Sequence, residues 1–218
     1  MKKKNTSLCR AACLLASFTV WTLLLHYVDV RAIGPRNSMV GFATLNALVR
    51  DIVGVNFSLY TITDWLGLVP IITALGFAVL GLIQWIKRKS LWRVESDILA
   101  LGVFYIAVMA LYIFFELFVI NRRPVLIDGY LEASYPSSTT VLVLCVMPTA
   151  AKQLHSRIQN RTVGRWIALA IFAFVVFMVA GRVLSGVHWI TDIIGGILLS
   201  LGLVYLYDGV CKSGRFCK

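Results

Sequence analysis

Three polar residues near the C-terminal end of the chain have types and a spacing that could do chemistry together. His188 and Asp192 are four residues apart, so they share a face if a helix begins near His188. A carboxylate that accepts the N–H of one imidazole nitrogen fixes the tautomer and leaves the other nitrogen as a nucleophile or base. Arg182 offers a planar fork of donors that suits phosphate oxygens. The structural alternative is a His–Asp pair that closes a helix turn, with Arg182 reaching toward lipid head groups.

Two further polar stretches lie at the ends of apolar runs. One is Asn121-Arg122-Arg123-Pro124, and the other covers residues 135–140, with the sequence Tyr-Pro-Ser-Ser-Thr-Thr. If the apolar runs are helices that cross a membrane, both stretches lie at the same surface as Arg182, His188 and Asp192. We therefore expect the three stretches to converge on one site.

The composition is that of a membrane protein. Of the 218 residues, 59% are hydrophobic and 14% are charged, and the mean hydropathy is +0.83. A soluble domain has roughly 45–50% apolar and about 25% charged residues. The net charge of +11 could suggest nucleic acid, but the basic residues punctuate the apolar runs, so we expect no nucleic-acid partner. The five cysteines have neither CxxC pairs nor histidines at zinc spacing, so we expect no metal.

Six apolar segments are close to the ~20 residues that cross a bilayer, and they predict a single all-α membrane domain over 1–218, a polytopic bundle of about six transmembrane helices. The segments are 11–29, 66–86, 97–120, 138–153, 166–183 and 189–208. The lysines before the first segment also fit a signal peptide, but no small-residue cleavage site follows, so an uncleaved span is favoured. Residues 31–65 are too polar to cross and predict an outer loop with an interfacial helix.

The basic residues predict the orientation. With the N-terminus in the cytoplasm, 15 of the 21 Lys and Arg, including every Lys, fall on the inside. The positive-inside rule then places both termini in the cytoplasm and the three polar stretches at the outer face. The compact form of six spans is typical of a bacterial plasma membrane.

The three stretches together resemble the type-2 phosphatidic-acid phosphatases, membrane-embedded and soluble enzymes related to vanadium haloperoxidases. The family pattern is Lys-x6-Arg-Pro, Pro-Ser-Gly-His and Ser-Arg-x5-His-x3-Asp. Here the third motif reads Gly181-Arg182-x5-His188-x3-Asp192. The second reads Pro136-Ser137-Ser138-Thr139, and the first reads Glu116-x6-Arg123-Pro124. The resemblance covers roughly 66–208, which is the expected phosphatase-like core.

The resemblance implies a function and a set of roles. His188 would attack phosphorus and form a phosphohistidine, and Asp192 would orient it. Arg123, Arg182, Ser137 and Ser138 would bind the phosphate, helped by the free N–H groups where a span begins. Family members use no metal or other cofactor. Their substrates are membrane lipid phosphates and diphosphates such as phosphatidic acid, phosphatidylglycerophosphate and polyprenyl diphosphates, for instance undecaprenyl diphosphate.

Two of the departures from the family pattern bear on activity. Thr139 stands where the family has the histidine that protonates the leaving group, and loss of a general acid costs about 10²–10⁴ in rate. An alkoxide leaving group has a conjugate acid with a pKa of about 15.7, whereas a phosphate leaves with a pKa of about 6. The sequence therefore predicts a preference for lipid diphosphates.

Glu116 stands where the family has a lysine. It could pair with Arg122 or Arg123, or it or Glu132 could donate the missing proton; we treat Thr139, Arg122 and Glu116 as auxiliary site positions. The alternative function is a relative that binds a phospholipid and is weakly active or inactive. A transporter or scaffold unrelated to phosphate is the remaining alternative.

Overall fold

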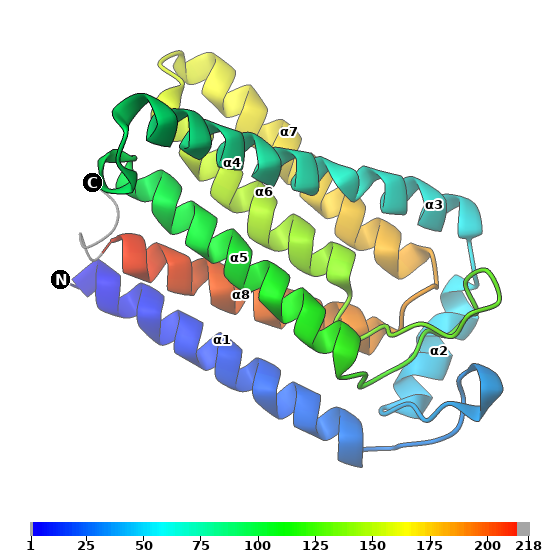
Figure 1. The fold of residues 1–218 in the computed structure, drawn as a ribbon. Coiled ribbons are helices and arrows are strands. Elements are labelled where there is room, and N and C mark those ends of the chain that lie inside the picture. Colours follow the sequence, from blue (N-terminus) through cyan, green and yellow to red (C-terminus); the bar gives the residue numbers. More distant parts are fainter. Residues whose placement is uncertain (1, 213–218) are drawn as a thin grey trace.

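The computed structural model describes residues 2–212, and these form a bundle of long helices (Figure 1). The helices are α1 (Lys2–Tyr27), α2 (Ala43–Val53), α3 (Phe57–Leu66), α4 (Leu68–Arg88), α5 (Ser96–Leu117), α6 (Ser138–Arg157), α7 (Arg161–Leu184) and α8 (Ile190–Cys211), with 3-10 turns η1 (Pro35–Asn37) and η2 (Leu91–Arg93). The start of α1 and the end of α8 lie at one end of the bundle, and α2 and the long connections lie at the other. The predicted all-helical bundle is confirmed.

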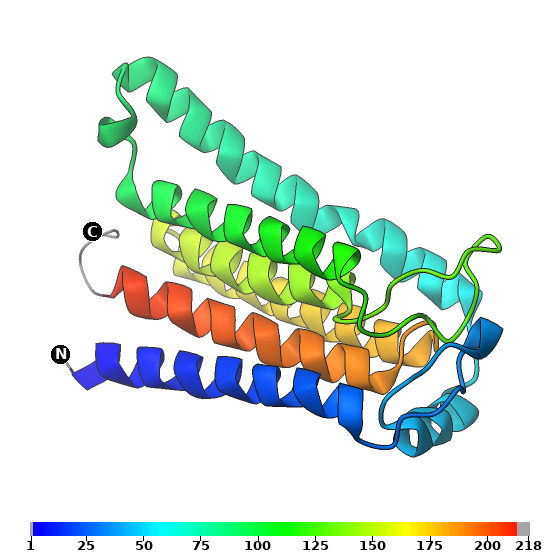
Figure 2. The ribbon, with the colours of Figure 1, turned by 60° about the horizontal axis from the view of Figure 1, so that its bottom comes forward.

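Within the described residues 2–212, five segments are long and apolar enough to cross a membrane: Thr6–Tyr27, Phe57–Arg88, Ser96–Leu117, Arg161–Leu184 and Ile190–Cys211. The sixth predicted span, 138–153, corresponds to α6, which also takes its place in the bundle (Figure 2). It is less apolar because its last turns contain Lys152, Gln153, His155 and Arg157. Half of its 20 residues are buried, so α6 is a central helix that the others enclose.

The predicted outer segment 31–65 is more helical than expected. It contains α2, and its last part is α3, which continues into α4 through Gly67. Figures 1 and 2 both show α3 and α4 nearly in line, and together they form one apolar stretch of 32 residues. Asn56 begins α3 by accepting the Leu59 N–H at 2.9 Å, which is a standard N-cap.

Helices α1 and α8 lie side by side along their length in both views. Small residues on α8 make this close approach possible. A Cβ added at Gly202 would lie 2.7 Å from Leu15 Cδ2, and one added at Gly209 would lie 2.5 Å from Leu8 Cδ2. This packing fixes α8, and with it the end of the helix that carries Asp192.

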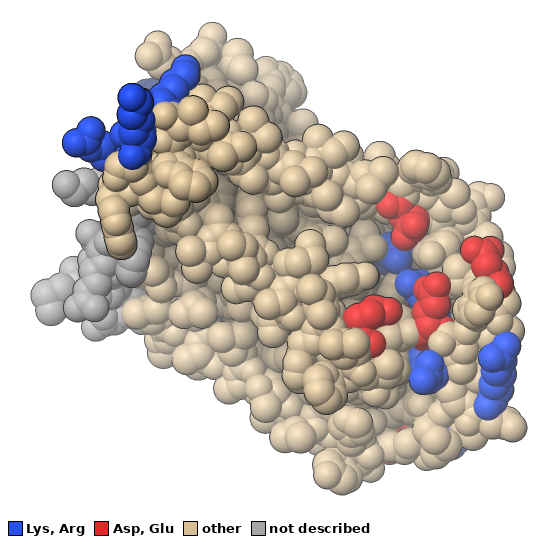
Figure 3. Space-filling model, in the orientation of Figure 1, with Lys and Arg blue, Asp and Glu red and all other residues tan. Residues whose placement is uncertain are grey.

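Charged side chains on the face in Figure 3 gather at the two ends of the bundle and leave the middle uncharged. Lysine and arginine occupy the end where α4 and α5 connect, and acidic and basic residues mix at the opposite end. This distribution is what a bilayer requires, because the apolar middle lies in hydrocarbon and the charges lie at its surfaces.

Candidate functional site

The three polar stretches of the sequence meet at one end of the bundle. The Ser137 N–H donates to the Asp192 carbonyl at 3.1 Å. Asn121 Nδ2 donates to Asp192 Oδ1 at 3.2 Å. Arg123 NH1 lies 3.4 Å from His188 Nε2. Residues separated by up to 71 positions are thus in direct contact, as the resemblance implied.

His188 lies between two guanidinium groups. Its Nε2 is 3.0 Å from Arg182 NH2 and 3.4 Å from Arg123 NH1. Because a guanidinium group only donates, Nε2 is the acceptor and the ring proton lies on Nδ1. Burial, and then the charges of Arg123 and Arg182, hold the pKa of His188 well below its ordinary value of 6.5, although the Ser134 backbone opposes this. The ring is therefore neutral, with its Nε2 lone pair directed at the arginines.

Asp192 lies beneath the imidazole but is not hydrogen-bonded to it. Its Oδ2 is 3.8 Å from His188 Nδ1, which is longer than a hydrogen bond. The same oxygen accepts the Trp189 N–H at 3.0 Å, so Asp192 also caps the first turn of α8. The carboxylate is fully buried, and it holds the start of α8 in place next to the ring.

The two arginines are buried, and each has an acidic neighbour. Arg182 NH1 lies 3.6 Å from Asp64 Oδ1, and Arg123 Nε lies 3.0 Å from Glu132 Oε2. The Tyr60 ring lies near both, with its centroid 5.0 Å from Arg182 Cζ and 5.7 Å from Arg123 Cζ. Cation–π contacts of this kind hold a guanidinium group in a fixed plane.

The sequence analysis missed Tyr60 and Asp64. Their only signal is that they stand four residues apart, at i and i+4, in a segment that the analysis assigned to an outer loop. The structure places that segment in α3, which packs against α7 near Arg182.

Arg182 also has a spare donor. Its Nε atom is buried and has no hydrogen-bond acceptor among residues 2–212, whereas Arg123 Nε faces Glu132 Oε2 at 3.0 Å. A buried donor without an acceptor is costly in a native protein and calls for an explanation. An oxygen atom of a bound anion would satisfy Arg182 Nε.

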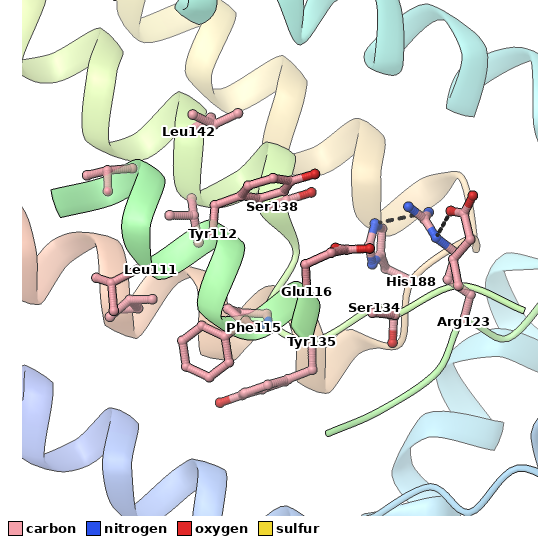
Figure 4. Close-up of a pocket in the computed structure, with 16 residues that line it drawn as sticks. Leu111, Tyr112, Phe115, Glu116, Arg123, Ser134, Tyr135, Ser138, Leu142 and His188 are labelled. Carbon is pink, nitrogen blue, oxygen red and sulfur yellow. Dashed lines mark hydrogen bonds and ion pairs between the residues drawn. The ribbon is translucent and has the colours of Figure 1, made fainter. Parts of the chain in front are cut away.

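His188 and Arg123 line a cavity of about 200 Å³, which we call the His188 cavity (Figure 4). Its other lining residues with polar side chains are Tyr112, Glu116, Glu132, Ser134, Tyr135 and Ser138. Figure 4 shows the Glu116 carboxylate at the end of α5 pointing toward the imidazole. The cavity is large enough for a phosphate group and the first atoms of its ester.

A second, larger cavity of about 630 Å³ lies between α4 and α5, and we call it the α4–α5 groove. Its lining is almost entirely apolar. Val108 and Leu142 line both the groove and the His188 cavity. The polar cavity is therefore adjacent to an apolar space that extends to Leu91 and Val94 near the other end of the bundle.

The residues of the second motif, Ser137, Ser138 and Thr139, do not all face the His188 cavity. Ser138 lines the cavity, but the Ser137 hydroxyl is buried and accepts from Thr140 Oγ1 at 3.0 Å. Thr139 faces α3 and α4, because its Cγ2 lies 3.6 Å from where a Cβ at Gly67 would be. Of these predicted residues, Ser138 is the one beside His188.

Arg122 lies outside the cavity lining. Its NH1 donates to the Leu131 carbonyl at 2.9 Å, and its own carbonyl accepts from Trp189 Nε1 at 2.8 Å. These contacts fix the loop 121–135 against the start of α8. The suggested pairing of Glu116 with Arg122 or Arg123 is not observed among the described ion pairs, since Arg123 pairs with Glu132.

Residues 31–65, predicted as an outer loop, form hydrogen bonds that hold the turn containing His188. Asn46 Nδ2 donates to Thr191 Oγ1 at 3.0 Å, and the Asn56 N–H donates to the Ser185 carbonyl at 2.9 Å. Gly186 has φ +63°, and a Cβ there would lie 1.9 Å from the Gly54 carbonyl oxygen. Only glycine fits this approach. The third motif is thus held from α2 and the α2–α3 connection as well as from α8.

Within residues 2–212, no group of three His, Cys, Asp or Glu side chains is placed to hold a metal ion. The charged donor that lines the His188 cavity is the Arg123 guanidinium group, a group suited to anions. The fold and the site together define a polytopic helical membrane protein with a buried His–Arg cluster at one end of the bundle.

The chain belongs to the PAP2 superfamily, which it matches over residues 11–209. Its fold is similar to that of a transmembrane PAP2-type phosphatidylglycerolphosphate phosphatase from Bacillus subtilis. The TM-score is 0.64 at 21% identity, with 94% of this chain and 96% of the other covered. No curated protein sequence matches the chain. The suspected family is therefore confirmed.

Proposed function

We propose that this protein is a membrane lipid phosphatase or diphosphatase that works through a phosphohistidine at His188. The observation that carries the proposal is the position of Nε2, unprotonated and within 3.4 Å of both Arg123 and Arg182. A phosphate that binds those guanidinium groups has its phosphorus next to the nucleophile. This is the arrangement that lets binding energy lower the barrier for attack.

The reaction has two steps. In the first, Nε2 attacks phosphorus and the bond from phosphorus to the lipid oxygen breaks, while the two arginines neutralise charge on the phosphoryl oxygens. Ser138 at the start of α6 adds donors from a helix N-terminus. In the second step, water attacks the phosphohistidine and releases phosphate. Asp192 stabilises the ring while it carries positive charge.

The lipid chain lies in the α4–α5 groove in this proposal. Val108 and Leu142 join that groove to the His188 cavity, so a substrate can keep its head group at the arginines and its chain in apolar surroundings. The groove lies between two helices that face lipid, which supports sideways entry from the bilayer.

The leaving group decides the preferred substrate. Thr139 faces Gly67, and a hydroxyl is a poor acid, so the site lacks the histidine that protonates an alkoxide. A diphosphate leaves as a phosphate with a pKa of about 6 and hardly needs the proton. We therefore propose that polyprenyl diphosphates turn over faster than phosphatidic acid or phosphatidylglycerophosphate. Catalysis is metal-independent in this scheme.

The orientation that we propose follows from the basic residues. The end of the bundle with the lysines faces the cytoplasm, both termini lie there, and the His188 cavity opens at the outer face of a bacterial plasma membrane. The alternative is a relative that binds phospholipid without hydrolysis. The two altered motif positions, Glu116 and Thr139, favour that alternative.

One experiment separates these functions. The purified protein is incubated with a polyprenyl diphosphate, phosphatidic acid and phosphatidylglycerophosphate, and both released phosphate and acid-labile phosphoprotein are measured. We expect release from the diphosphate above all, and no release or phosphoprotein in His188→Ala. His155→Ala, at the other end of α6, is the matched control and keeps full activity. Binding of the lipids without release by the parent would support the non-hydrolytic relative.

A further inference from the structure

Glu116 is the most unusual group in the His188 cavity. It occupies the position where the family motif has a lysine, seven residues before Arg123. It adds a carboxylate to a site that already has Asp64 and Glu132 beside its two arginines. A carboxylate that serves only charge balance is not needed there.

Glu116 is also free of the contacts that occupy the other two carboxylates. Asp64 and Glu132 each lie within 3.6 Å of an arginine. Glu116 makes no ion pair with a basic side chain in the part of the chain that the structure describes, lines the same cavity as His188, and points toward the imidazole. Among these three acids, it is the one able to exchange a proton with a ligand.

The direction of attack places the leaving oxygen on the side of Glu116. In-line displacement puts the leaving oxygen opposite Nε2. The lipid chain attached to that oxygen can continue into the apolar groove only past Val108 and Leu142, which both cavities share. Glu116, Tyr112 and Ser138 line the cavity between His188 and that junction.

We propose that Glu116 is the acid that protonates the leaving oxygen. It takes the role of the family's general-acid histidine, whose position is occupied here by Thr139. This inference rests on the proposed function.

The proton transfers balance over the two steps. As the phosphorus–oxygen bond breaks, the proton moves from the Glu116 carboxyl group to the lipid oxygen, giving a lipid alcohol and a carboxylate. In the second step the carboxylate takes a proton from the attacking water. The new phosphorus–oxygen bond replaces the phosphorus–nitrogen bond, whose electron pair returns to Nε2.

The proposal also accounts for the lost lysine. A lysine at position 116 would stay positively charged at neutral pH, since its ordinary pKa is about 10.4, and would therefore mainly bind phosphate. A carboxyl group weakens phosphate binding and supplies the proton. The exchange of lysine for glutamate and the exchange of histidine for threonine are thus two parts of one change in the site.

The test compares Glu116→Gln with the parent on phosphatidic acid and on a polyprenyl diphosphate. We expect kcat on phosphatidic acid to fall by about 10²–10⁴ and kcat on the diphosphate to change less than about threefold, because its leaving group needs little protonation. Glu116→Lys should lower KM for both substrates but keep kcat on phosphatidic acid low. Asp51→Asn, on α2 at the same end of the bundle, removes a carboxylate outside the cavity and should change neither.

Several outcomes would overturn the proposal. Equal losses of kcat on both substrates, with an unchanged unfolding midpoint, would make Glu116 a positioning residue. A rise in kcat/KM on both substrates would show that it only repels phosphate. Both results leave the function of His188 intact, whereas a parent that hydrolyses neither substrate overturns the proposed function and this inference with it.

Discussion

The Nε2 atom of His188 accepts a hydrogen bond from Arg182 NH2 at 3.0 Å. This contact joins the end of α7 to the turn before α8 and holds the nucleophile of the proposed reaction against one of its phosphate-binding groups. Without substrate, the guanidinium group occupies the lone pair that would attack phosphorus. A phosphate that binds Arg182 therefore both draws the guanidinium group away and brings the electrophile to the freed nitrogen.

The turn between α7 and α8 should not tolerate a side chain at Gly186. Gly186→Ala places a Cβ 1.9 Å from the Gly54 carbonyl oxygen at a φ of +63°, so we expect a loss of more than about 2 kcal/mol in the free energy of unfolding and of most activity. Thermal unfolding in detergent measures the first, and phosphate release measures the second. Gly76→Ala, in α4 with no atom within 4 Å of the new Cβ, should be neutral or slightly stabilising. Equal effects of the two changes would refute the steric account.

The hydrogen bonds from Asn46 on α2 to Thr191 on α8 should affect turnover as well as stability. Asn46 is buried and pairs with Thr191 through both of its side-chain polar atoms. Asn46→Ala leaves the Thr191 hydroxyl without its partner, so the free energy of unfolding should fall by about 1–3 kcal/mol. It should also lower kcat, because the start of α8 shifts. Asn160→Ala removes the N-cap of α7 at the far end, costs about 1 kcal/mol and should leave kcat unchanged. If kcat falls equally in both, the loss reflects general stability.

Glu132 should compete with the substrate for Arg123. The ion pair at 3.0 Å involves a carboxylate whose side chain is 41% exposed, so it contributes at most about 1 kcal/mol. Glu132→Gln should therefore lower KM, and the inhibition constant of inorganic phosphate, by about two- to fivefold. Steady-state kinetics with added phosphate measures both. Asp128→Asn removes a charge from the same loop, and an equal shift there would mean that only net charge matters.

The buried imidazole should make stability fall in acid. Burial and the two arginines lower the pKa of His188 in the folded protein, whereas the unfolded chain takes up the proton near pH 6.5. Below that pH the unfolded state binds more protons, so stability declines as the pH falls, by up to about 1.4 kcal/mol per unit. Unfolding midpoints at pH 7.5 and 5.5 in the parent and in His188→Gln measure this. The variant should lose less stability on acidification, and identical slopes would contradict the prediction.

Local features of the site were predictable from the sequence. The hydropathy of the segments gave the bundle, because a span across a bilayer must be long and apolar. The proximity of His188 and Asp192 was expected from their four-residue spacing at a helix start, although the expected hydrogen bond between them is not formed. The positions of Arg123, Ser138 and Arg182 near the ends of apolar segments predicted that they lie at one surface. The beginning of the second span was predicted about nine residues late, since α3 carries Thr61, Thr63 and Asp64 and reads as polar.

The sequence by itself thus determined the kind of protein and the end of the bundle at which Arg123, Arg182 and His188 meet, since these depend on hydropathy and on neighbours along one helix. Only the tertiary structure decided which carboxylate each arginine faces, that Asn46 supports α8, that Thr139 turns toward Gly67, and that Glu116 lies in the cavity with His188. These contacts depend on the rotation and packing of helices that are far apart in the chain, and spacing along a sequence does not specify that rotation.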